Sequence, residues 1–358
     1  MRILVTGVTG FIGGHLADRL HGAGWEVRGL ARDPGDAATL AAQGMEIVQG
    51  SLLDRTGVAA AVPGCDAVIH AGAWTGGPGV SDADAWITNV AATGWLLEAA
   101  RQAGVRRFVY LSSVAVYGLN SAAVIDETAA TPPVGQLYPD SKIAAETLVR
   151  GAGADGLATT IVRPASTYGP RGGAWTVGPV EQIKAGSLVL LGRDDGLVNP
   201  SYIDNFVDGV LLALDSPAAA GETFNICDGI AVTYRDFYLR YAAMLGKTGL
   251  RTVPAFVARG AASPPGRWLR RVMGKQPPGP WSVHFRFNPS RFSIDKARRL
   301  LGYTPRVSFD EGMRRTEAWL REAGVSLADG IWPIADSRRH LPLATCHLPP
   351  ATCPLPPD

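Results

Sequence analysis

This sequence of 358 residues has few cysteines and almost no net charge. The four cysteines have no paired spacing in the part expected to fold, which excludes a disulfide framework and indicates a reducing compartment; they are Cys65, Cys227, Cys346 and Cys353. The formal net charge of +2 excludes a general attraction to nucleic acid. Cys346, His347 and Cys353 match no zinc-binding spacing, so we expect no metal site.

Long apolar stretches are also missing. No run approaches the ~20 residues that a membrane-spanning helix requires, and the opening segment is broken by glycine too early for a secretory signal. With 46% hydrophobic and 18% charged residues, the composition is typical of a globular protein with a large core. We expect a cytoplasmic protein built as one large domain or two closely joined ones.

The sequence does contain a glycine-rich turn. Residues 2–6 predict a short apolar strand, residues 14–21 have helical periodicity, and between them stand Gly7, Gly10 and Gly13. Glycine at these positions permits a tight turn, a close approach to a pyrophosphate and close packing of helix on sheet. The N-terminus of the helix favours phosphates, so this turn predicts a dinucleotide site.

The second predicted strand, residues 26–32, bears on which dinucleotide binds. An acidic residue at its end would bind the ribose hydroxyls of NAD, but this strand ends in Ala31 and Arg32. A guanidinium there suits the 2′-phosphate of NADP, unless Arg32 is a solvated residue beside Asp33. The sequence therefore favours NADP over NAD.

Further strands are predicted at residues 46–50, 67–73, 107–113 and 159–164, separated by helical segments such as 84–104. Such alternation is typical of an α/β Rossmann fold with a doubly wound parallel sheet, in which ligands bind at the carboxyl ends of the strands. The small residues Ala71, Gly72 and Ala73 would leave room for the cofactor there. We expect His70, inside a buried strand, to serve packing.

A possible catalytic pair follows. Tyr138 and Lys142 share one face of a predicted helix because they are four residues apart. An ammonium beside a phenol favours the phenolate and so lowers the pKa of the tyrosine. A decrease of about three pKa units, roughly 4 kcal/mol, would let the tyrosine act as an acid or base at neutral pH. Ser112 and Ser113 end a predicted strand, so we expect both to point toward the cofactor. The Ser113 hydroxyl would hydrogen-bond the reacting oxygen.

Taken together, these motifs resemble the extended short-chain dehydrogenase/reductase family, also called the NAD-dependent epimerase/dehydratase family. The resemblance covers about residues 1–323 and rests on segments 6–13, 69–73, 111–118, 138–142, 163–170, 202–205, 224–229 and 301–305. Within the family, segments 54–73, 163–170, 224–237 and 291–297 look most like the 3β-hydroxysteroid dehydrogenase-like branch. The resemblance implies an enzyme that interconverts a secondary alcohol and a ketone by hydride transfer.

The resemblance also implies roles for particular residues. Tyr138 would be the acid/base, Lys142 would hold the nicotinamide ribose and lower the tyrosine pKa, and Ser113 would polarise the substrate oxygen. Cofactor contacts are implied for Gly7, Thr9, Gly10, Phe11, Ile12, Gly13, Arg32, Leu52, Ala71, Gly72, Ala73, Asn89, Ser112, Tyr138, Lys142, Pro164 and Ser166.

Some positions depart from the family pattern. Ser51 stands where relatives often carry an aspartate near the adenine, and Ser166 stands where nucleotide-sugar enzymes usually carry an asparagine. Ser166 therefore weakens the alternative of a nucleotide-sugar epimerase or dehydratase with a retained cofactor. A non-catalytic NADP-binding protein is a third alternative, disfavoured because the catalytic trio is intact. By analogy with the family, helices near 85–104 and 138–153 would form a homodimer.

The C-terminal half is expected to bind the small-molecule substrate. Residues 1–170, completed by about 204–230, would form the dinucleotide-binding core, and 171–203 with 231–325 the substrate-binding region. Residues 237–294 contain ten lysines and arginines and no acidic residue. They predict a basic lid, an anionic substrate site, or peripheral contact with an anionic membrane that delivers a hydrophobic substrate. The proline-rich tail 326–358 predicts disorder.

Overall fold

A computed structural model of the chain describes residues 1–77, 79–192, 196–254, 256–257, 260, 263–265, 268 and 280–324. Its centre is a seven-stranded sheet in which every neighbouring pair is parallel. The strands, with their order β12-β7-β5-β4-β1-β2-β3, are β1 (Arg2–Thr6), β2 (Glu26–Ala31), β3 (Glu46–Gln49), β4 (Ala67–His70), β5 (Arg107–Leu111), β7 (Thr159–Pro164) and β12 (Thr223–Ile226). The predicted doubly wound Rossmann sheet is confirmed.

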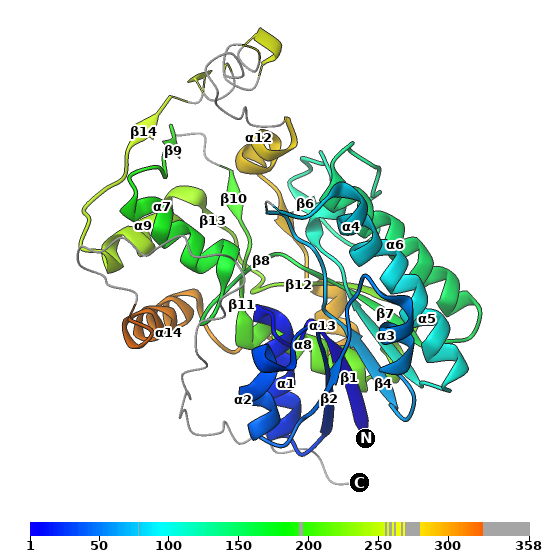
Figure 1. The fold of residues 1–358 in the computed structure, drawn as a ribbon. Coiled ribbons are helices and arrows are strands. Elements are labelled where there is room, and N and C mark those ends of the chain that lie inside the picture. Colours follow the sequence, from blue (N-terminus) through cyan, green and yellow to red (C-terminus); the bar gives the residue numbers. More distant parts are fainter. Residues whose placement is uncertain are drawn as a thin grey trace.

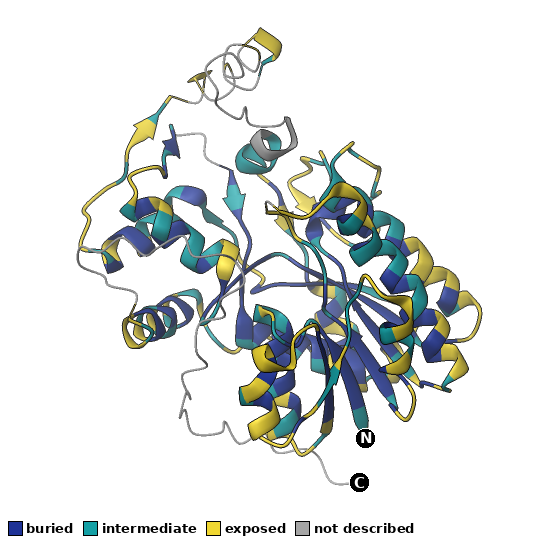
Figure 2. Ribbon diagram, viewed as in Figure 1, coloured by how far each residue is buried: buried dark blue, intermediate teal, exposed yellow. Residues whose placement is uncertain are grey.

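Helices cover both faces of this sheet (Figure 1). One face carries α3 (Arg55–Ala60), α5 (Ala92–Gln102) and α6 (Leu137–Ala154), and the other carries α1 (Phe11–Gly22), α8 (Ile203–Asp215) and α13 (Asp295–Leu301). Apart from the edge strand β3, the strands are largely buried on both faces, as Figure 2 shows. A strand covered on both faces is mostly apolar, which is why residues 67–69 of β4 and 108–111 of β5 are continuous hydrophobic runs rather than alternating ones.

The single helix predicted over residues 84–104 is three consecutive pieces. They are α4 (Asp82–Trp86), a π-helical turn (Ile87–Ala91) and α5. The π turn carries one extra residue per turn and so changes which side chains face the sheet. Asn89 lies within it. Helical periodicity in the sequence does not reveal such a turn, because its neighbours on both sides are ordinary helix.

A smaller region lies beside the sheet, at the upper left and top of Figure 1. Its elements are α7 (Gly178–Lys184), β9 (Leu190–Leu191), β10 (Leu197–Val198), β13 (Val232–Thr233), α9 (Tyr234–Met244), β14 (Thr252–Val253), α12 (Pro280–Phe287) and α14 (Phe309–Glu322). Short pairs join it to the sheet domain: β8 (Ser166–Tyr168) with β11 (Pro200–Tyr202), and β6 (Val124–Ile125) with β15 (Arg291–Phe292). A further short helix, α2 (Ala38–Ala42), precedes β3.

Several predictions fall on parts of the chain that are not described. The tail from residue 325 onward and much of the basic stretch 237–294 lie outside the described residues, so the alternatives for the lid stay predictions. Cys65 and Cys227 are buried free thiols. Among the described residues, no helix combines the length and the apolar character that crossing a bilayer requires.

Candidate active site

The glycine turn packs so tightly that side chains could not replace its glycines. Gly7 has φ +67°, and a Cβ atom there would lie 2.6 Å from the Cα of Gly72 on the neighbouring β4 loop. A Cβ atom at Gly13 would lie 2.1 Å from the Gly7 carbonyl oxygen. Gly10 precedes α1, and no side chain caps that helix, so its first N–H groups remain for a ligand. This cradle fits the phosphates of a dinucleotide.

Around the turn, Thr9, Phe11 and Ile12 are half-buried and Gly10 is exposed, so a ligand can reach them. Leu52 packs against Gly72, because a Cβ atom at Gly72 would lie 2.7 Å from the Cδ1 atom of Leu52. The structure therefore brings together the predicted cofactor residues of the first, third and fourth strands: Gly7, Thr9, Gly10, Phe11, Ile12, Gly13, Leu52, Ala71, Gly72 and Ala73.

His70 connects this cradle to the helices above the sheet. Its Nδ1 atom lies 2.7 Å from the Thr6 hydroxyl, which accepts the Gly72 N–H at 3.0 Å. Its Nε2 atom lies 3.1 Å from the Thr93 hydroxyl, and that hydroxyl donates to a helix carbonyl. Nε2 must then carry the ring proton. Burial, with the charge of Lys142, lowers the pKa of His70 to about 3, so the ring stays neutral and structural.

Asn89, for which a cofactor contact is predicted, has both of its side-chain polar atoms hydrogen-bonded within the protein. Its Oδ1 atom accepts the Trp74 N–H at 2.8 Å, and its Nδ2 atom donates to the Trp74 carbonyl at 2.9 Å and to Ser141 at 2.9 Å. Ser141 donates to the Tyr138 carbonyl oxygen at 2.8 Å. These bonds occupy the side chain and leave it 1% exposed, so Asn89 ties the loop after β4 to the first turn of α6.

Ser113 and Tyr138 meet at the carboxyl end of β5. Ser113 follows that strand and begins a 3₁₀ turn by accepting the Ala115 N–H at 3.1 Å. Its hydroxyl hydrogen is therefore available for Tyr138, which stands in the first turn of α6 and whose pKa the Ser113 hydroxyl lowers. Both side chains are half-buried. Ser113 and Tyr138 thus lie together at the carboxyl edge of the sheet, the edge at which β1 leads into the glycine turn.

Lys142 is buried, but it does not act on the tyrosine as predicted. Its Nζ atom donates to the Leu111 carbonyl oxygen at 2.8 Å and lies 4.8 Å from the centre of the Tyr110 ring. Burial, against the hydrogen bond from Ser113, leaves the pKa of Tyr138 above its ordinary value. The expected depression of this pKa is wrong for the protein without ligand. Burial lowers the pKa of Lys142 itself to about 7, opposed by the charge of Glu146.

Ser112 faces away from the cradle, contrary to expectation. Its hydroxyl donates to Glu146 at 2.6 Å and its N–H donates to the Val162 carbonyl oxygen at 2.7 Å. Glu146 stands one turn after Lys142 on α6 and also accepts two hydrogen bonds from Arg163 on β7, at 2.8 and 2.6 Å. Sequence reasoning missed Glu146. The sequence feature that could have indicated Glu146 is its position four residues after Lys142, which places both on the same helix face.

Tyr117 extends this buried polar cluster toward the substrate region. Its hydroxyl accepts from Arg163 at 2.9 Å and donates to Asn225 at 2.7 Å. Its ring stacks on Phe292 with centroids 5.6 Å apart. Neither its own motif nor that of Arg163 indicated that these side chains meet, because one comes from a 3₁₀ turn and the other from β7.

Three predicted residues lie further along the edge of the sheet. Arg32 is exposed at the end of β2, and it forms no ion pair with any described residue. Pro164 ends β7 and is buried, as is Ser166 at the start of β8. Arg32 therefore presents an exposed guanidinium just after the carboxyl end of β2.

Known proteins resemble this chain over most of its length. A 4-hydroxy-2-methyl-3-oxo-4-farnesyl-3,4-dihydroquinoline-1-oxide ketoreductase of Stigmatella aurantiaca is 31% identical, covering 90% of this chain and 97% of that protein. A 2-alkyl-3-oxoalkanoate reductase of Stenotrophomonas maltophilia is 32% identical, covering 89% and 99%. A 3 beta-hydroxysteroid dehydrogenase/Delta 5-->4-isomerase of Mycobacterium tuberculosis is 31% identical, covering 85% and 86%.

Solved structures share the fold. A short-chain dehydrogenase/reductase superfamily protein from Agrobacterium tumefaciens with bound NAD has a TM-score of 0.69 at 25% identity, covering 90% of this chain and 98% of that chain. UDP-glucose 4-epimerase from Thermotoga maritima has a TM-score of 0.73 at 24% identity, covering 90% and 99%.

Residues 3–227 match the family described as the NAD dependent epimerase/dehydratase family. This range contains the whole parallel sheet apart from the first residue of β1, together with the glycine cradle and the Ser113–Tyr138 pair. The chain therefore belongs to the NAD-dependent epimerase/dehydratase family and is an NAD(P)-dependent enzyme of the extended short-chain dehydrogenase/reductase type, with 3β-hydroxysteroid dehydrogenases among its relatives.

Proposed function

We propose that this enzyme reduces a ketone to a secondary alcohol, or runs the reverse reaction, with Tyr138 as proton donor and NADP as preferred cofactor. One observation carries the proposal: the Ser113 hydroxyl lies within hydrogen-bonding reach of Tyr138 and lowers the pKa of its phenol, at the same carboxyl edge of the sheet as the glycine cradle. A carbonyl oxygen placed between the two hydroxyls would accept from both at once.

The protonation state of Tyr138 suits reduction. Since burial raises its pKa, the phenol carries its proton at neutral pH and can donate it as negative charge develops on the oxygen. Ser113 stabilises the same charge with its hydroxyl hydrogen. The bound nicotinamide supplies hydride chemistry, so the protein has to provide orientation and electrostatics.

Lys142 would hold the cofactor ribose. An ammonium has three donor hydrogens, and one of them is used by the Leu111 carbonyl, which leaves two for ribose hydroxyls. The bond to Leu111 also fixes the side chain against β5, directly before Ser113. In this proposal Lys142 positions the nicotinamide over the Ser113–Tyr138 pair.

The preference for NADP rests on Arg32. The exposed guanidinium at the end of β2 suits a 2′-phosphate, which it can hold by two charge-assisted hydrogen bonds. The relatives' names point to hydrophobic ketones and hydroxysteroids as the substrate class.

The test is spectrophotometric. Oxidation of NADPH and of NADH would be followed with a 3-ketosteroid, a 2-alkyl-3-oxoalkanoate and a UDP-sugar, for the wild type and for Tyr138→Phe. We expect turnover with a hydrophobic ketone, and a loss of about 10²–10⁴-fold in kcat for Tyr138→Phe with unchanged affinity for NADP. Tyr303→Phe, which removes a buried hydroxyl bonded to the Cys227 carbonyl, is the matched control and should retain kcat.

Two outcomes would contradict the proposal. If Tyr138→Phe kept most of its kcat, the assignment of the acid would be wrong. If the enzyme converted only the UDP-sugar, with no net release of reduced or oxidised cofactor, it would be an epimerase or dehydratase that retains its cofactor.

A further inference from the structure

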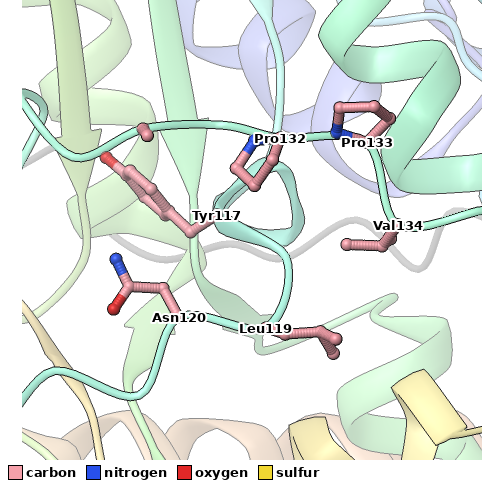
Figure 3. Close-up of a pocket in the computed structure, with 7 residues that line it drawn as sticks. Tyr117, Leu119, Asn120, Pro132, Pro133 and Val134 are labelled. Atoms are coloured by element: carbon pink, nitrogen blue, oxygen red, sulfur yellow. The ribbon is translucent and has the colours of Figure 1, made fainter.

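A pocket opens between the segment that follows Ser113 and the segment that precedes Tyr138, and it takes no part in the mechanism above (Figure 3). It has a volume of about 570 Å³, which lies in the range of ligand pockets of ~300–1,000 Å³. Its walls come from two segments, one after Ser113 and one before Tyr138. The lining residues are Tyr117, Leu119, Asn120, Ala130, Pro132, Pro133 and Val134.

The first wall is rigid because Tyr117 is held from behind. Its hydroxyl is bonded to Arg163 and Asn225, at 2.9 and 2.7 Å, and its ring stacks on Phe292. Only the ring is left to line the pocket. Asn120 follows it, with its Oδ1 atom accepting the Ala122 N–H at 3.0 Å, and its amide nitrogen lies on the side of the Tyr117 ring in Figure 3.

The second wall is attached to the catalytic helix. The Val134 and Gln136 N–H groups donate to the two oxygens of Asp140 on α6, at 2.7 and 3.0 Å. Two prolines stiffen the segment before it. The walls touch at Gly118, which has φ +62° and where a Cβ atom would lie 2.7 Å from Val134 Cγ1.

The pocket lies close to the reacting groups. Ser113 and Tyr117 are the two ends of one 3₁₀ turn, so about 8 Å of helix rise separates them. Val134 precedes Tyr138 by four residues, and its N–H is hydrogen-bonded to Asp140 on α6, the helix that carries Tyr138. Each wall of the pocket therefore begins within about four residues of one of the two reacting side chains.

From its lining, we infer that the pocket binds an uncharged hydrocarbon arm of the ketone substrate, such as an alkyl chain or a fused ring, and that this arm sets substrate specificity. The inference rests on the proposed function. None of the seven lining residues is charged, so a nucleoside diphosphate would lose its hydration without gaining a cation. An alkyl arm instead gains contact with proline, leucine and valine side chains, and Asn120 offers one hydrogen-bond donor at the rim.

The experiment measures binding without turnover. Calorimetric titrations of 2-alkanones from 2-butanone to 2-decanone would be made into the protein saturated with oxidised NADP, in which no reduction can occur. We expect Kd to fall by up to about fourfold per added methylene as the chain fills the pocket. Leu119→Trp, at a side chain that is 52% exposed, should fill the pocket and remove most of this dependence.

Leu212→Trp, on the far helix α8 and 37% exposed, is the matched control and should keep the wild-type dependence. A flat Kd series in the wild type, or an unchanged series in Leu119→Trp, would overturn the inference. Turnover of a short ketone reports separately on the proposed function: chain-length binding without any turnover would refute the reductase and leave the pocket standing.

Discussion

Glu146 on α6 and Arg163 on β7 form a two-bond ion pair behind the catalytic residues, with both side chains buried. Burial alone would raise the pKa of Glu146, but the hydrogen bonds and charge of Arg163 hold it below its ordinary value. A carboxyl with a lowered pKa stabilises the fold above its unfolded pKa of ~4.3 and loses that contribution as the pH falls through the folded value.

Glu146→Gln should therefore destabilise the protein by about 3–5 kcal/mol at pH 7, because it leaves Arg163 buried without its counter-charge. The free energy of unfolding from urea denaturation measures this. Arg150→Ala removes the half-exposed partner of the same carboxylate and should cost less than about 1 kcal/mol. Equal losses of unfolding free energy in the two variants would contradict the distinction between the buried pair with Arg163 and the more exposed pair with Arg150.

Cofactor binding should take up a proton through Lys142. With its pKa lowered to about 7 by burial, Lys142 is mostly neutral at pH 8 and mostly charged at pH 6. Ribose hydroxyls and nearby phosphates favour the charged form, so NADP binding should take up close to one proton at pH 8 and little at pH 6.

Calorimetry in two buffers with different ionisation enthalpies measures this uptake. Lys142→Met should abolish it. Lys296→Met should not, because Lys296 pairs with Glu222 at the amino end of β12, away from the cofactor edge of the sheet. Uptake that persisted in Lys142→Met would show that another group takes the proton.

Cofactor preference should depend on Arg32. Arg32→Ala removes the charge proposed to bind the 2′-phosphate, so KM for NADPH should rise by about 10- to 100-fold while KM for NADH stays constant. Steady-state kinetics with both cofactors measures the ratio. Arg55→Ala, at an exposed arginine paired with Glu98, is the control. Equal changes in KM for NADPH and NADH in Arg32→Ala would argue against a contact with the 2′-phosphate.

Gly13→Ala should abolish cofactor binding. The added Cβ atom would lie 2.1 Å from the Gly7 carbonyl oxygen, a backbone atom that cannot yield without opening the cradle. Gly22→Ala, at the other end of the same helix α1, has nothing within 4 Å of the new atom and should be neutral or slightly stabilising. Fluorescence titration with NADPH compares the two, and normal binding by Gly13→Ala would disprove the close packing of the cradle.

Much of the fold could be predicted because its signals are local. The glycine turn, the buried strands and the helices α13 and α14 each follow from composition and periodicity over a few residues. The π turn around Asn89 could not, since a single extra residue per turn leaves no mark on an apolar repeat. The side-chain partners of Asn89 show that it holds the loop after β4.

The sequence by itself determined the parallel sheet, the dinucleotide cradle and the placing of Tyr138 and Lys142 on one helix face, because each depends on neighbours within a few positions. Only the tertiary structure decided that Ser112 turns to Glu146, that Lys142 bonds to a carbonyl of β5 instead of charging the phenol, and that a pocket opens between the segments after Ser113 and before Tyr138. These depend on partners far apart in the chain, 34 residues for Ser112 and Glu146 and 108 for Tyr117 and Asn225. Burial in such long-range contacts, which no local pattern encodes, sets the pKa of each group.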